Sequence, residues 1–237
     1  MTVQSETEIN ELFERARTCA RLGSPEEEQK IYDTIITRCS ENPSPQMRIF
    51  AAKALLNKGV VLGSNGHTQA AREVCDKVVH MIGNAQDSES RECAAIALVN
   101  KAILLSREPG GTGAAISVYD EVASLFGDAP SPRIAAQVAK ALCNKANLYA
   151  AQGETDHACE TYDGVVARFG NASALELKKW VARALFNKGV LFGRVMDRDA
   201  SHAAYDEIIR RFETEEDAEL KDYVAKAQFN KGMSYHF

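Results

Sequence analysis

One short segment recurs along the whole chain and constrains its fold more than any other feature. It reads Ala-Arg-Ala-Leu-Phe-Asn-Lys-Gly over residues 182–189, and four related copies carry the same Asn-Lys pair. The asparagines of the five copies are spaced by 43 or 44 residues: Asn57, Asn100, Asn144, Asn187 and Asn230. A fixed period of 20–50 residues is the signature of a repeat array, in which each unit packs mainly on its neighbours. The chain is therefore expected to form one continuous array.

Each period is predicted to hold two helices joined by a tight turn. A second landmark shares the period: Tyr32-Asp33, Cys75-Asp76, Tyr119-Asp120, Tyr162-Asp163 and Tyr205-Asp206. Turn signals such as Gly66-His67 and Gly153-Glu154 separate the two landmarks. Ser44-Pro45 and Ser131-Pro132 are typical helix starts, because serine caps the first turn and proline fits its first position. First helices are expected to begin near Pro45, Ser88, Pro132 and Ser173, and no strand signals occur.

These observations predict an all-α, right-handed α-solenoid of five helix pairs and a C-terminal capping helix. A single domain, 1–237, is expected, with units at roughly 5–43, 44–86, 87–130, 131–172 and 173–214 and a final helix within 215–237. The first unit is degenerate, since Glu14-Arg15-Ala16 replaces the recurrent segment, as terminal repeats often do. Gln228 stands where the other copies have leucine, which favours a genuine capping helix.

Composition excludes several classes of protein. The formal net charge of −5 and a pI near 5.6 argue against a general nucleic-acid-binding face. The six cysteines show no paired spacing, so buried free thiols in a reducing compartment are expected. The N-terminus is polar and acidic, unlike a signal peptide, and no apolar run approaches the ~18 residues of a membrane helix. We therefore expect a cytoplasmic protein that binds neither membrane nor nucleic acid.

No constellation of residues predicts an enzyme. Phosphate-binding, zinc-protease and nucleophile-elbow motifs are all absent from the sequence. The five histidines occupy unrelated repeat positions, so no metal site and no cofactor are predicted. The expectation is a protein that acts by binding and not by catalysis.

The repeat resembles the tetratricopeptide repeat, whose pattern alternates small residues with large or aromatic ones. The third full unit carries that pattern at Ala146, Tyr149, Gly153, Ala158, Tyr162 and Val165. The 43-residue period exceeds the usual 34 and is similar to the lengthened units of kinesin light chains. The segment Cys143-Asn144-Lys145-Ala146-Asn147-Leu148-Tyr149 carries that second resemblance. The resemblance implies an interaction scaffold that holds a peptide or protein segment in a concave groove.

The recurrent asparagines admit two interpretations. In the family, asparagines at this place face the groove and bond the ligand, which would assign Asn57, Asn100, Asn144, Asn147, Asn187 and Asn230 to a peptide site. Their presence in every unit favours instead a structural role between neighbouring helices, and the two roles are compatible. One helical turn upstream lie the cations Lys53, Lys140, Arg183 and Lys226, with Ile96 in the second copy. Cation and asparagine on one face would suit an acidic peptide, but a merely solvated basic face is the alternative.

A recurrent lysine is the last informative group: Lys58, Lys101, Lys145, Lys188 and Lys231. It falls within the apolar arc of the helix, where an unpaired charge would cost several kcal/mol. The recurrent aspartates are the candidate partners, either within one unit or in the preceding unit. Only pairing with the preceding unit uses every aspartate and all five lysines, so we predict Asp33–Lys58, Asp76–Lys101, Asp120–Lys145, Asp163–Lys188 and Asp206–Lys231. A row of lysines that reads phosphates is the alternative.

The sequence as a whole predicts a non-enzymatic scaffold for protein–protein interaction, with a peptide or protein ligand that carries acidic groups. A structural module that associates with its own copies is a second hypothesis. A sensor or regulatory component of a larger signalling system is a third. The sequence does not identify the ligand.

Overall fold

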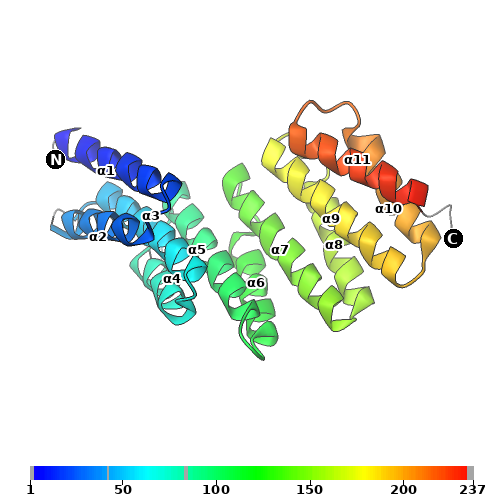
Figure 1. Ribbon diagram of the computed structural model, residues 1–237, viewed down its shortest axis with the longest axis horizontal. Coiled ribbons are helices and arrows are strands. Elements are labelled where there is room, and N and C mark those ends of the chain that lie inside the picture. Colours follow the sequence, from blue (N-terminus) through cyan, green and yellow to red (C-terminus); the bar gives the residue numbers. More distant parts are fainter. Residues whose placement is uncertain (1–2, 42, 83–84, 234–237) are drawn as a thin grey trace. The chain divides into compact units, whose positions relative to one another are not determined.

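The computed structural model describes residues 3–41, 43–82 and 85–233, which form helices and no strand (Figure 1). In chain order the helices are α1 (Val3–Arg21), α2 (Pro25–Glu41), α3 (Pro45–Ser64), α4 (Thr68–Ile82), α5 (Ser88–Ser106), α6 (Thr112–Phe126), α7 (Pro132–Gln152), α8 (Thr155–Phe169), α9 (Leu175–Arg194), α10 (Arg198–Phe212) and α11 (Ala218–Met233). The chain divides into two compact units, Met1–Val118 and Tyr119–Phe237, with the division inside α6. Odd-numbered helices are the first helices of the repeats, and even-numbered helices are the second.

The helix starts follow the sequence closely. α3, α5 and α7 begin at the predicted residues, whereas α9 begins two residues after Ser173. Ser44 caps α3, because its side chain accepts a hydrogen bond from the Met47 backbone N–H. Ser131 was expected to do the same for α7 but makes no side-chain cap bond, so Pro132 alone marks that start. The predicted extension of α11 to Phe237 lies outside the described residues.

The turns inside the helix pairs use left-handed backbone. Gly66 and Gly153 have φ of +82° and +78°, and neither lies inside a helix, as predicted. In the fourth full copy Met196 occupies the equivalent turn with φ of +62°. A side chain at this φ is strained by roughly 1 kcal/mol or more, so the fourth turn is held by its surroundings.

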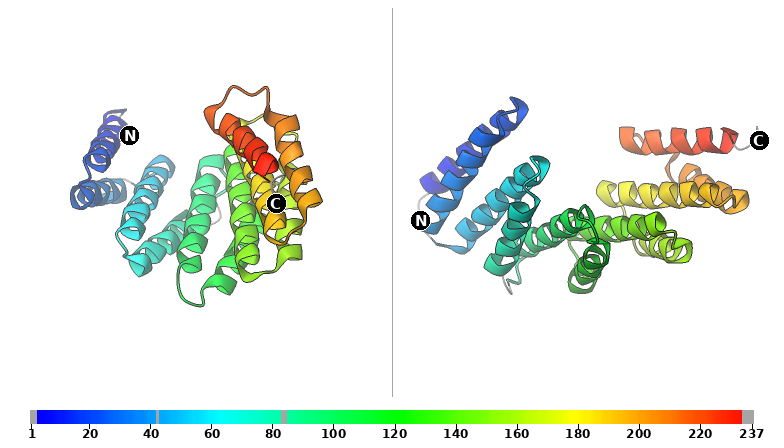
Figure 2. Two further views of the ribbon diagram at one scale, coloured as in Figure 1. Left: turned by 45° about the vertical axis from the view of Figure 1, so that its right-hand side comes forward. Right: turned by 60° about the horizontal axis from the view of Figure 1, so that its bottom comes forward.

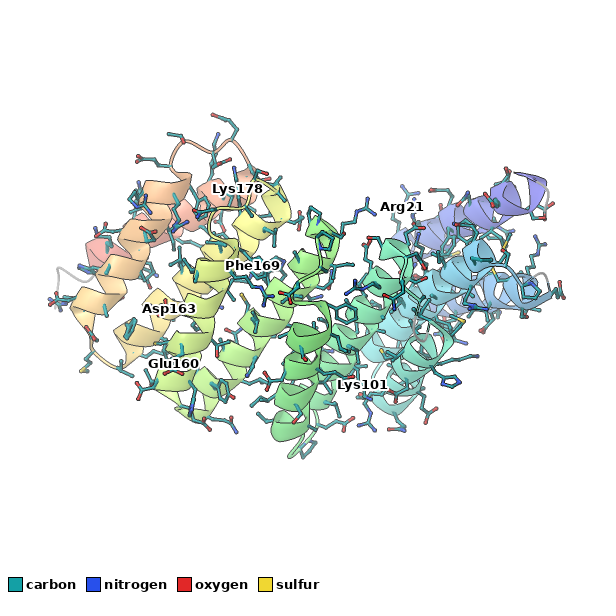
Figure 3. The ribbon with its side chains drawn as sticks, turned by 180° about the vertical axis from the view of Figure 1, so that it is seen from behind. Arg21, Lys101, Glu160, Asp163, Phe169 and Lys178 are labelled. Atoms are coloured by element: carbon teal, nitrogen blue, oxygen red, sulfur yellow. The ribbon has the colours of Figure 1, made fainter. Side chains whose placement is uncertain are left out.

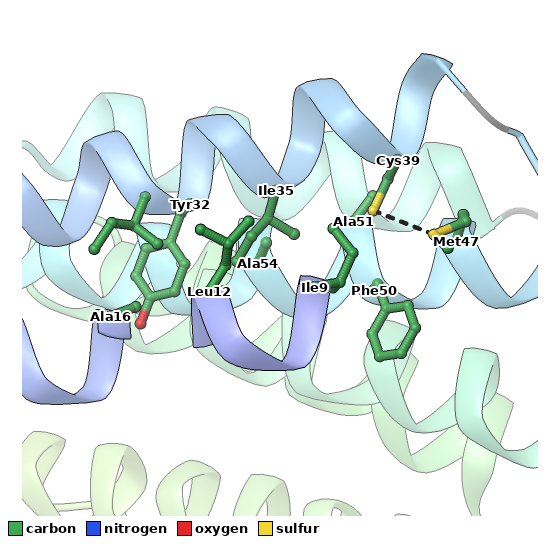
Figure 4. Close-up of a cluster of buried hydrophobic side chains, with 11 residues drawn as sticks. Ile9, Leu12, Ala16, Tyr32, Ile35, Cys39, Met47, Phe50, Ala51 and Ala54 are labelled. Atoms are coloured by element: carbon green, nitrogen blue, oxygen red, sulfur yellow. Dashed lines mark hydrogen bonds between the residues drawn. The ribbon is translucent and has the colours of Figure 1, made fainter. Parts of the chain in front are cut away.

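In the first unit, each helix packs on its neighbours in sequence, and the first helices α3 and α5 also contact each other. The N-terminal pair closes this packing with a cluster that joins α1, α2 and α3 (Figure 4). Ile9 and Leu12 of the degenerate α1 pack there against Tyr32 and Ile35 of α2 and Ala54 of α3. The degenerate helix α1 therefore still makes apolar contacts with α2 and α3, although it lacks the recurrent segment.

The second unit repeats this arrangement. α7, α9 and α11 lie next to one another as first helices, and α8 and α10 pack on the first helices that precede and follow them (Figures 1 and 2). The alanines that precede the recurrent leucine are fully buried in all five copies: Ala54, Ala97, Ala141, Ala184 and Ala227. Small residues at these points let the helices approach closely.

The predicted pairing of each recurrent lysine with an aspartate of the preceding repeat is confirmed for all five pairs. Nζ of each lysine lies 2.5–2.6 Å from Oδ1 of an aspartate in the preceding repeat for Lys58–Asp33, Lys101–Asp76, Lys145–Asp120 and Lys188–Asp163, and Lys231 pairs with Asp206 in the same way. Lys101 and Asp163, which belong to two of these pairs, are labelled in Figure 3. The lysine side chains are 16–29% exposed and the aspartates 53–58%. The pairs thus lie at the edge of the apolar interface, since a lysine stem can follow apolar surface while its ammonium reaches water.

Candidate functional site

The predicted peptide-site residues occupy adjacent first helices. In the first unit Lys53 and Asn57 lie on α3 and Asn100 lies on α5, which pack together. In the second unit the remaining residues lie on the neighbouring helices α7, α9 and α11: Lys140, Asn144, Asn147, Arg183, Asn187, Lys226 and Asn230. Each unit therefore has its own set of candidate residues.

Most of the asparagines with described contacts join neighbouring repeats through a tyrosine. Nδ2 of Asn230 donates to the Tyr205 hydroxyl at 3.0 Å. Asn187 donates to Oδ1 of Asn147 at 2.9 Å, and the Tyr162 hydroxyl donates to that same oxygen. The Asn230–Tyr205 and Asn187–Asn147 bonds cross between repeats, whereas the Tyr162–Asn147 bond lies within one, and all three support the structural interpretation of the asparagines.

In the first compact unit, Asn57 keeps the contact with a tyrosine, whereas Asn100 has a cysteine at that position. Asn57 bonds the Tyr32 hydroxyl, whose pKa is raised by burial and by its hydrogen bond to Glu28. Cys75 takes the tyrosine position beside Asn100. A thiol is a weak hydrogen-bonding group, so Asn100 has a poorer protein partner than its counterparts.

Two of the four predicted cations are neutralised by carboxylates. Nζ of Lys53 lies 2.9 Å from Glu89 of the next first helix, and Nζ of Lys226 lies 2.6 Å from Asp222 one turn before it. An ion that already has a partner of opposite charge offers less to an acidic ligand. Lys53 and Lys226 are therefore weaker candidates than the sequence alone indicated.

Lys140 and Arg183 form a different environment on α7 and α9. Burial lowers the pKa of the Lys140 ammonium, and the nearby Arg183 charge lowers it further. Glu176 stands 36 residues after Lys140, as Glu89 does after Lys53, but it lies 3.8 Å from Lys179. No carboxylate pairs with Lys140 among the described residues.

Arg183 is held in place by aromatic residues. Its Cζ lies 4.7 Å from the centroid of the Trp180 ring, and its Nε donates to the Tyr223 hydroxyl at 2.9 Å. Trp180 is the only tryptophan of the chain. The guanidinium is thus oriented by stacking and by one hydrogen bond, while its terminal nitrogens are left for other partners.

Two cavities open between first helices, at equivalent places in the two units. The first has a volume of about 190 Å³ between α3 and α5, and the second about 320 Å³ between α7 and α9. Arg107 and Asn100 line the first, and Arg194 and Asn187 line the second. Neither arginine was predicted from the sequence, although each follows its recurrent asparagine by seven residues.

The described residues contain little that could support nucleophilic or metal chemistry. Burial raises the pKa of the Cys39, Cys75 and Cys93 thiols to about 11 and that of Cys143 to about 12. A thiol with such a pKa is a poor nucleophile near neutral pH. All six cysteines are free, as expected, and the described part of the chain holds no cluster of His, Cys, Asp and Glu suited to a metal ion. No helix described in the structure is long and apolar enough to cross a membrane.

Comparison with known proteins identifies the repeat. Residues 139–168, which include most of α7 and all of α8 but its last residue, match the tetratricopeptide repeat family, so the resemblance seen in the sequence is confirmed for this segment. No curated protein matches the chain. Among solved structures, an assembly chaperone of RpL4 (Acl4, residues 1–338) is 15% identical, and the match covers 96% of this chain and 98% of that chain with a TM-score of 0.32. The similarity to kinesin light chains stays a resemblance.

Proposed function

We propose that this tetratricopeptide-repeat chain is a non-enzymatic interaction scaffold that holds an acidic peptide segment against its first helices. The observation that carries the proposal is the pair Lys140 and Arg183, two cations on adjacent helices without a carboxylate between them. An acidic side chain of a ligand would supply the missing partner, and its affinity would come from charge-assisted hydrogen bonds.

The surroundings of the pair support this assignment. Trp180 and Tyr223 hold the Arg183 guanidinium, which reduces the entropy lost when it binds a carboxylate. The partly buried ammonium of Lys140 is less well hydrated than an exposed one, so a carboxylate stabilises it more. Asn144 lies one turn after Lys140 on the same face of α7 and would bond the peptide backbone.

Trp180 provides the assay, because its indole lies directly under Arg183. An array of acidic peptides would be screened against the whole chain, and the affinity of the best binder measured by tryptophan fluorescence. The double variant Lys140→Gln/Arg183→Gln is expected to bind about 100-fold more weakly or worse, since it loses two hydrogen bonds to charged groups, each of which contributes ~1.5–3 kcal/mol, and 1.4 kcal/mol is tenfold. Its binding should also depend less on salt.

A charge-matched control separates a specific site from general attraction. Lys53→Gln/Lys226→Gln removes the same charge from cations that already have carboxylate partners. We expect this variant to bind within about twofold of the wild type, because exposed neutralised ions contribute little. An equal loss in both variants would reduce the effect to non-specific electrostatics, and unchanged affinity in the first would refute the site.

One observation favours a second function, association between copies of the chain. Phe229 of α11 is 66% exposed, although the equivalent side chains of earlier repeats are buried (Leu56, Val99 and Cys143) or partly buried (Phe186). A first helix of another copy could cover this residue as a following repeat would. Light scattering across a range of concentrations tests this: growth in mass that Phe229→Glu abolishes supports it, whereas a constant monomer refutes it.

A further inference from the structure

The two cavities between first helices are built from the same repeat positions, 87 residues apart. Val60, Cys75, Ile103 and Leu104 of the first correspond to Asn147, Tyr162, Val190 and Leu191 of the second, and the other lining residues except Gly59 correspond in the same way. Each cavity therefore has one first helix on either side and a second helix beneath. Because the two lie in separate compact units, the arrangement arises twice from the repeat itself.

One sequence feature is common to both cavities. Seven residues after the recurrent asparagine, α3 and α7 carry the small residues Ser64 and Ala151. At the same position α5 and α9 carry Arg107 and Arg194. A small residue on one helix thus leaves room beside an arginine on the next.

Neither cavity contains an acidic group to balance its arginine. The residues that line both cavities are apolar, hydroxyl, thiol, amide or guanidinium groups, and none is Asp or Glu. Arg107 and Arg194 form no ion pair within the described part of the chain. Two arginines outside the cavities do form ion pairs, Arg72 with Glu108 at 3.1 Å and Arg168 with Asp128 at 3.6 Å.

The helix ends beside the cavities do not cancel this positive charge. Each helix C-terminus carries about −0.5 of an elementary charge on its last carbonyls, which would oppose an anion. Backbone N–H groups of the following turns already bond several of these carbonyls, including those of Val61, Leu62 and Gly63 at the end of α3. Leu191, Phe192 and Gly193 at the end of α9 are bonded in the same way. The full charge of the guanidinium therefore dominates in each cavity.

We infer that each cavity is a subsite for one glutamate side chain of an acidic peptide, with the carboxylate on Arg107 or Arg194 and the methylenes on the apolar walls. This inference rests on the proposed function and adds to it the residue type that the scaffold selects. A glutamate fits both requirements, because its two methylenes reach past Val60 and Ile103, or past Val190, before the carboxylate meets the arginine. The planar guanidinium binds a carboxylate through two parallel hydrogen bonds.

The two cavities differ in the hydrogen bonds that their asparagine side chains make. In the second, Asn187 and the Tyr162 hydroxyl both donate to Asn147, so Arg194 acts without help from that network. In the first, Cys75 replaces the tyrosine, and Asn100 can donate to the ligand beside Arg107. The smaller first cavity is therefore expected to bind a glutamate more tightly than the second.

The test uses the full chain, labelled with ¹⁵N, and three small probes in NMR titrations. N-acetyl-L-glutamic acid α-amide carries only a side-chain carboxylate, and N-acetyl-L-glutamine α-amide is its neutral isostere. N-acetyl-L-alanine carries a chain-terminal carboxylate instead. We expect the glutamate probe to shift the Nε–H signals of Arg107 and Arg194 with dissociation constants in the millimolar range, about tenfold tighter than the glutamine probe.

Each cavity serves as the control for the other. Arg107→Gln should abolish the response of the Asn100 side-chain amide and leave that of Arg194 intact, and Arg194→Gln should do the reverse. A preserved response at the second cavity also shows that the variant is folded. Equal shifts with the glutamine probe, or an Asn100 response that survives Arg107→Gln, would overturn the inference. Equal or tighter binding of the alanine probe would assign the cavities to a chain terminus and overturn the glutamate assignment.

The outcome is separable from that of the proposed function. If the glutamate probe shifts no signal in either cavity but peptide binding depends on Lys140 and Arg183, only the glutamate subsites are refuted. Responding cavities in a chain that binds acidic peptides independently of Lys140 and Arg183 would refute only the proposed site at those two residues.

Discussion

The lysine–aspartate pairs allow a quantitative test of how the repeats are held in register. In the pair Lys145–Asp120, Nζ and Oδ1 lie 2.5 Å apart, and the side chains are 16% and 53% exposed. An exposed ion pair contributes ~0.2–1 kcal/mol, whereas breaking a buried pair costs ~3–5 kcal/mol. Asp120→Ala leaves a mostly covered ammonium without its carboxylate, so we expect a loss of about 1–2 kcal/mol in the free energy of unfolding. The Tyr149 ring, 5.5 Å from Nζ, limits the loss.

Urea unfolding followed by circular dichroism at 222 nm measures this loss. Asp128→Ala is the matched control, because Asp128 is a fully exposed aspartate with only a 3.6 Å contact to Arg168. It should change stability by less than about 0.5 kcal/mol. The double variant Asp120→Ala/Lys145→Met keeps an apolar stem but removes the unpaired charge, so it should regain much of the loss.

Two results would refute this reasoning. If Asp120→Ala and Asp128→Ala behave alike, the pair between repeats contributes no more than an exposed ion. If the double variant is no more stable than Asp120→Ala, the loss does not come from an unpaired lysine. In either case the recurrence of these residues would need another physical explanation.

Three further predictions concern single positions in the second unit. Hydrogen bonds from Arg210, and with them those from Arg211, lower the pKa of Glu207 to about 2. A lowered folded-state pKa contributes stability above pH ~4.5 that is lost as the pH falls towards 2. Glu207→Gln should therefore cost about 1 kcal/mol at pH 7 and nearly nothing at pH 2, measured by urea unfolding at both values. Gly189→Ala should destabilise by roughly 1–3 kcal/mol in thermal unfolding, because a Cβ there would lie 2.6 Å from the Tyr205 ring. Gly164 has open space around it, so Gly164→Ala should stabilise by about 0.5–1 kcal/mol. Equal effects of the two substitutions would contradict the close approach of the Tyr205 ring to Gly189. Met196→Gly should raise stability by about 1 kcal/mol by relieving a positive φ, and a lower melting temperature would show that the Met196 side chain compensates for its strain.

Local chemistry explains what the sequence could predict. The turns at Gly66 and Gly153 follow from the freedom of glycine to adopt positive φ, and the start of α3 follows from the chemistry of Ser44 and Pro45. The partners of the lysines were predictable because only one pairing scheme used every charge. The exposure of the lysine side chains was not predictable, since a helical position specifies the direction of Cβ but not where a long side chain ends.

The candidate site depended on contacts that one repeat cannot reveal. Arg107 and Arg194 face cavities only because a small residue stands at the same position in the preceding repeat. The neutralisation of Lys53 by Glu89 and the stacking of Arg183 on Trp180 likewise follow from neighbouring residues and not from the recurrent segment itself. A scan for residues common to all copies cannot find such features.

This difference indicates how the chain separates stability from recognition. The residues that every copy retains are used between repeats: the buried alanines before the leucine, the lysines on aspartates, and the asparagines wherever a tyrosine faces them. The cations without a carboxylate partner that the proposals use, Lys140, Arg183, Arg107 and Arg194, stand at positions that vary between copies. Four residues before the asparagine stand Lys53, Ile96, Lys140, Arg183 and Lys226, and seven residues after it stand Ser64, Arg107, Ala151 and Arg194. If the proposals are correct, substitutions at the invariant positions will lower stability in proportion to burial, whereas substitutions at the variable positions will change ligand affinity with little effect on unfolding.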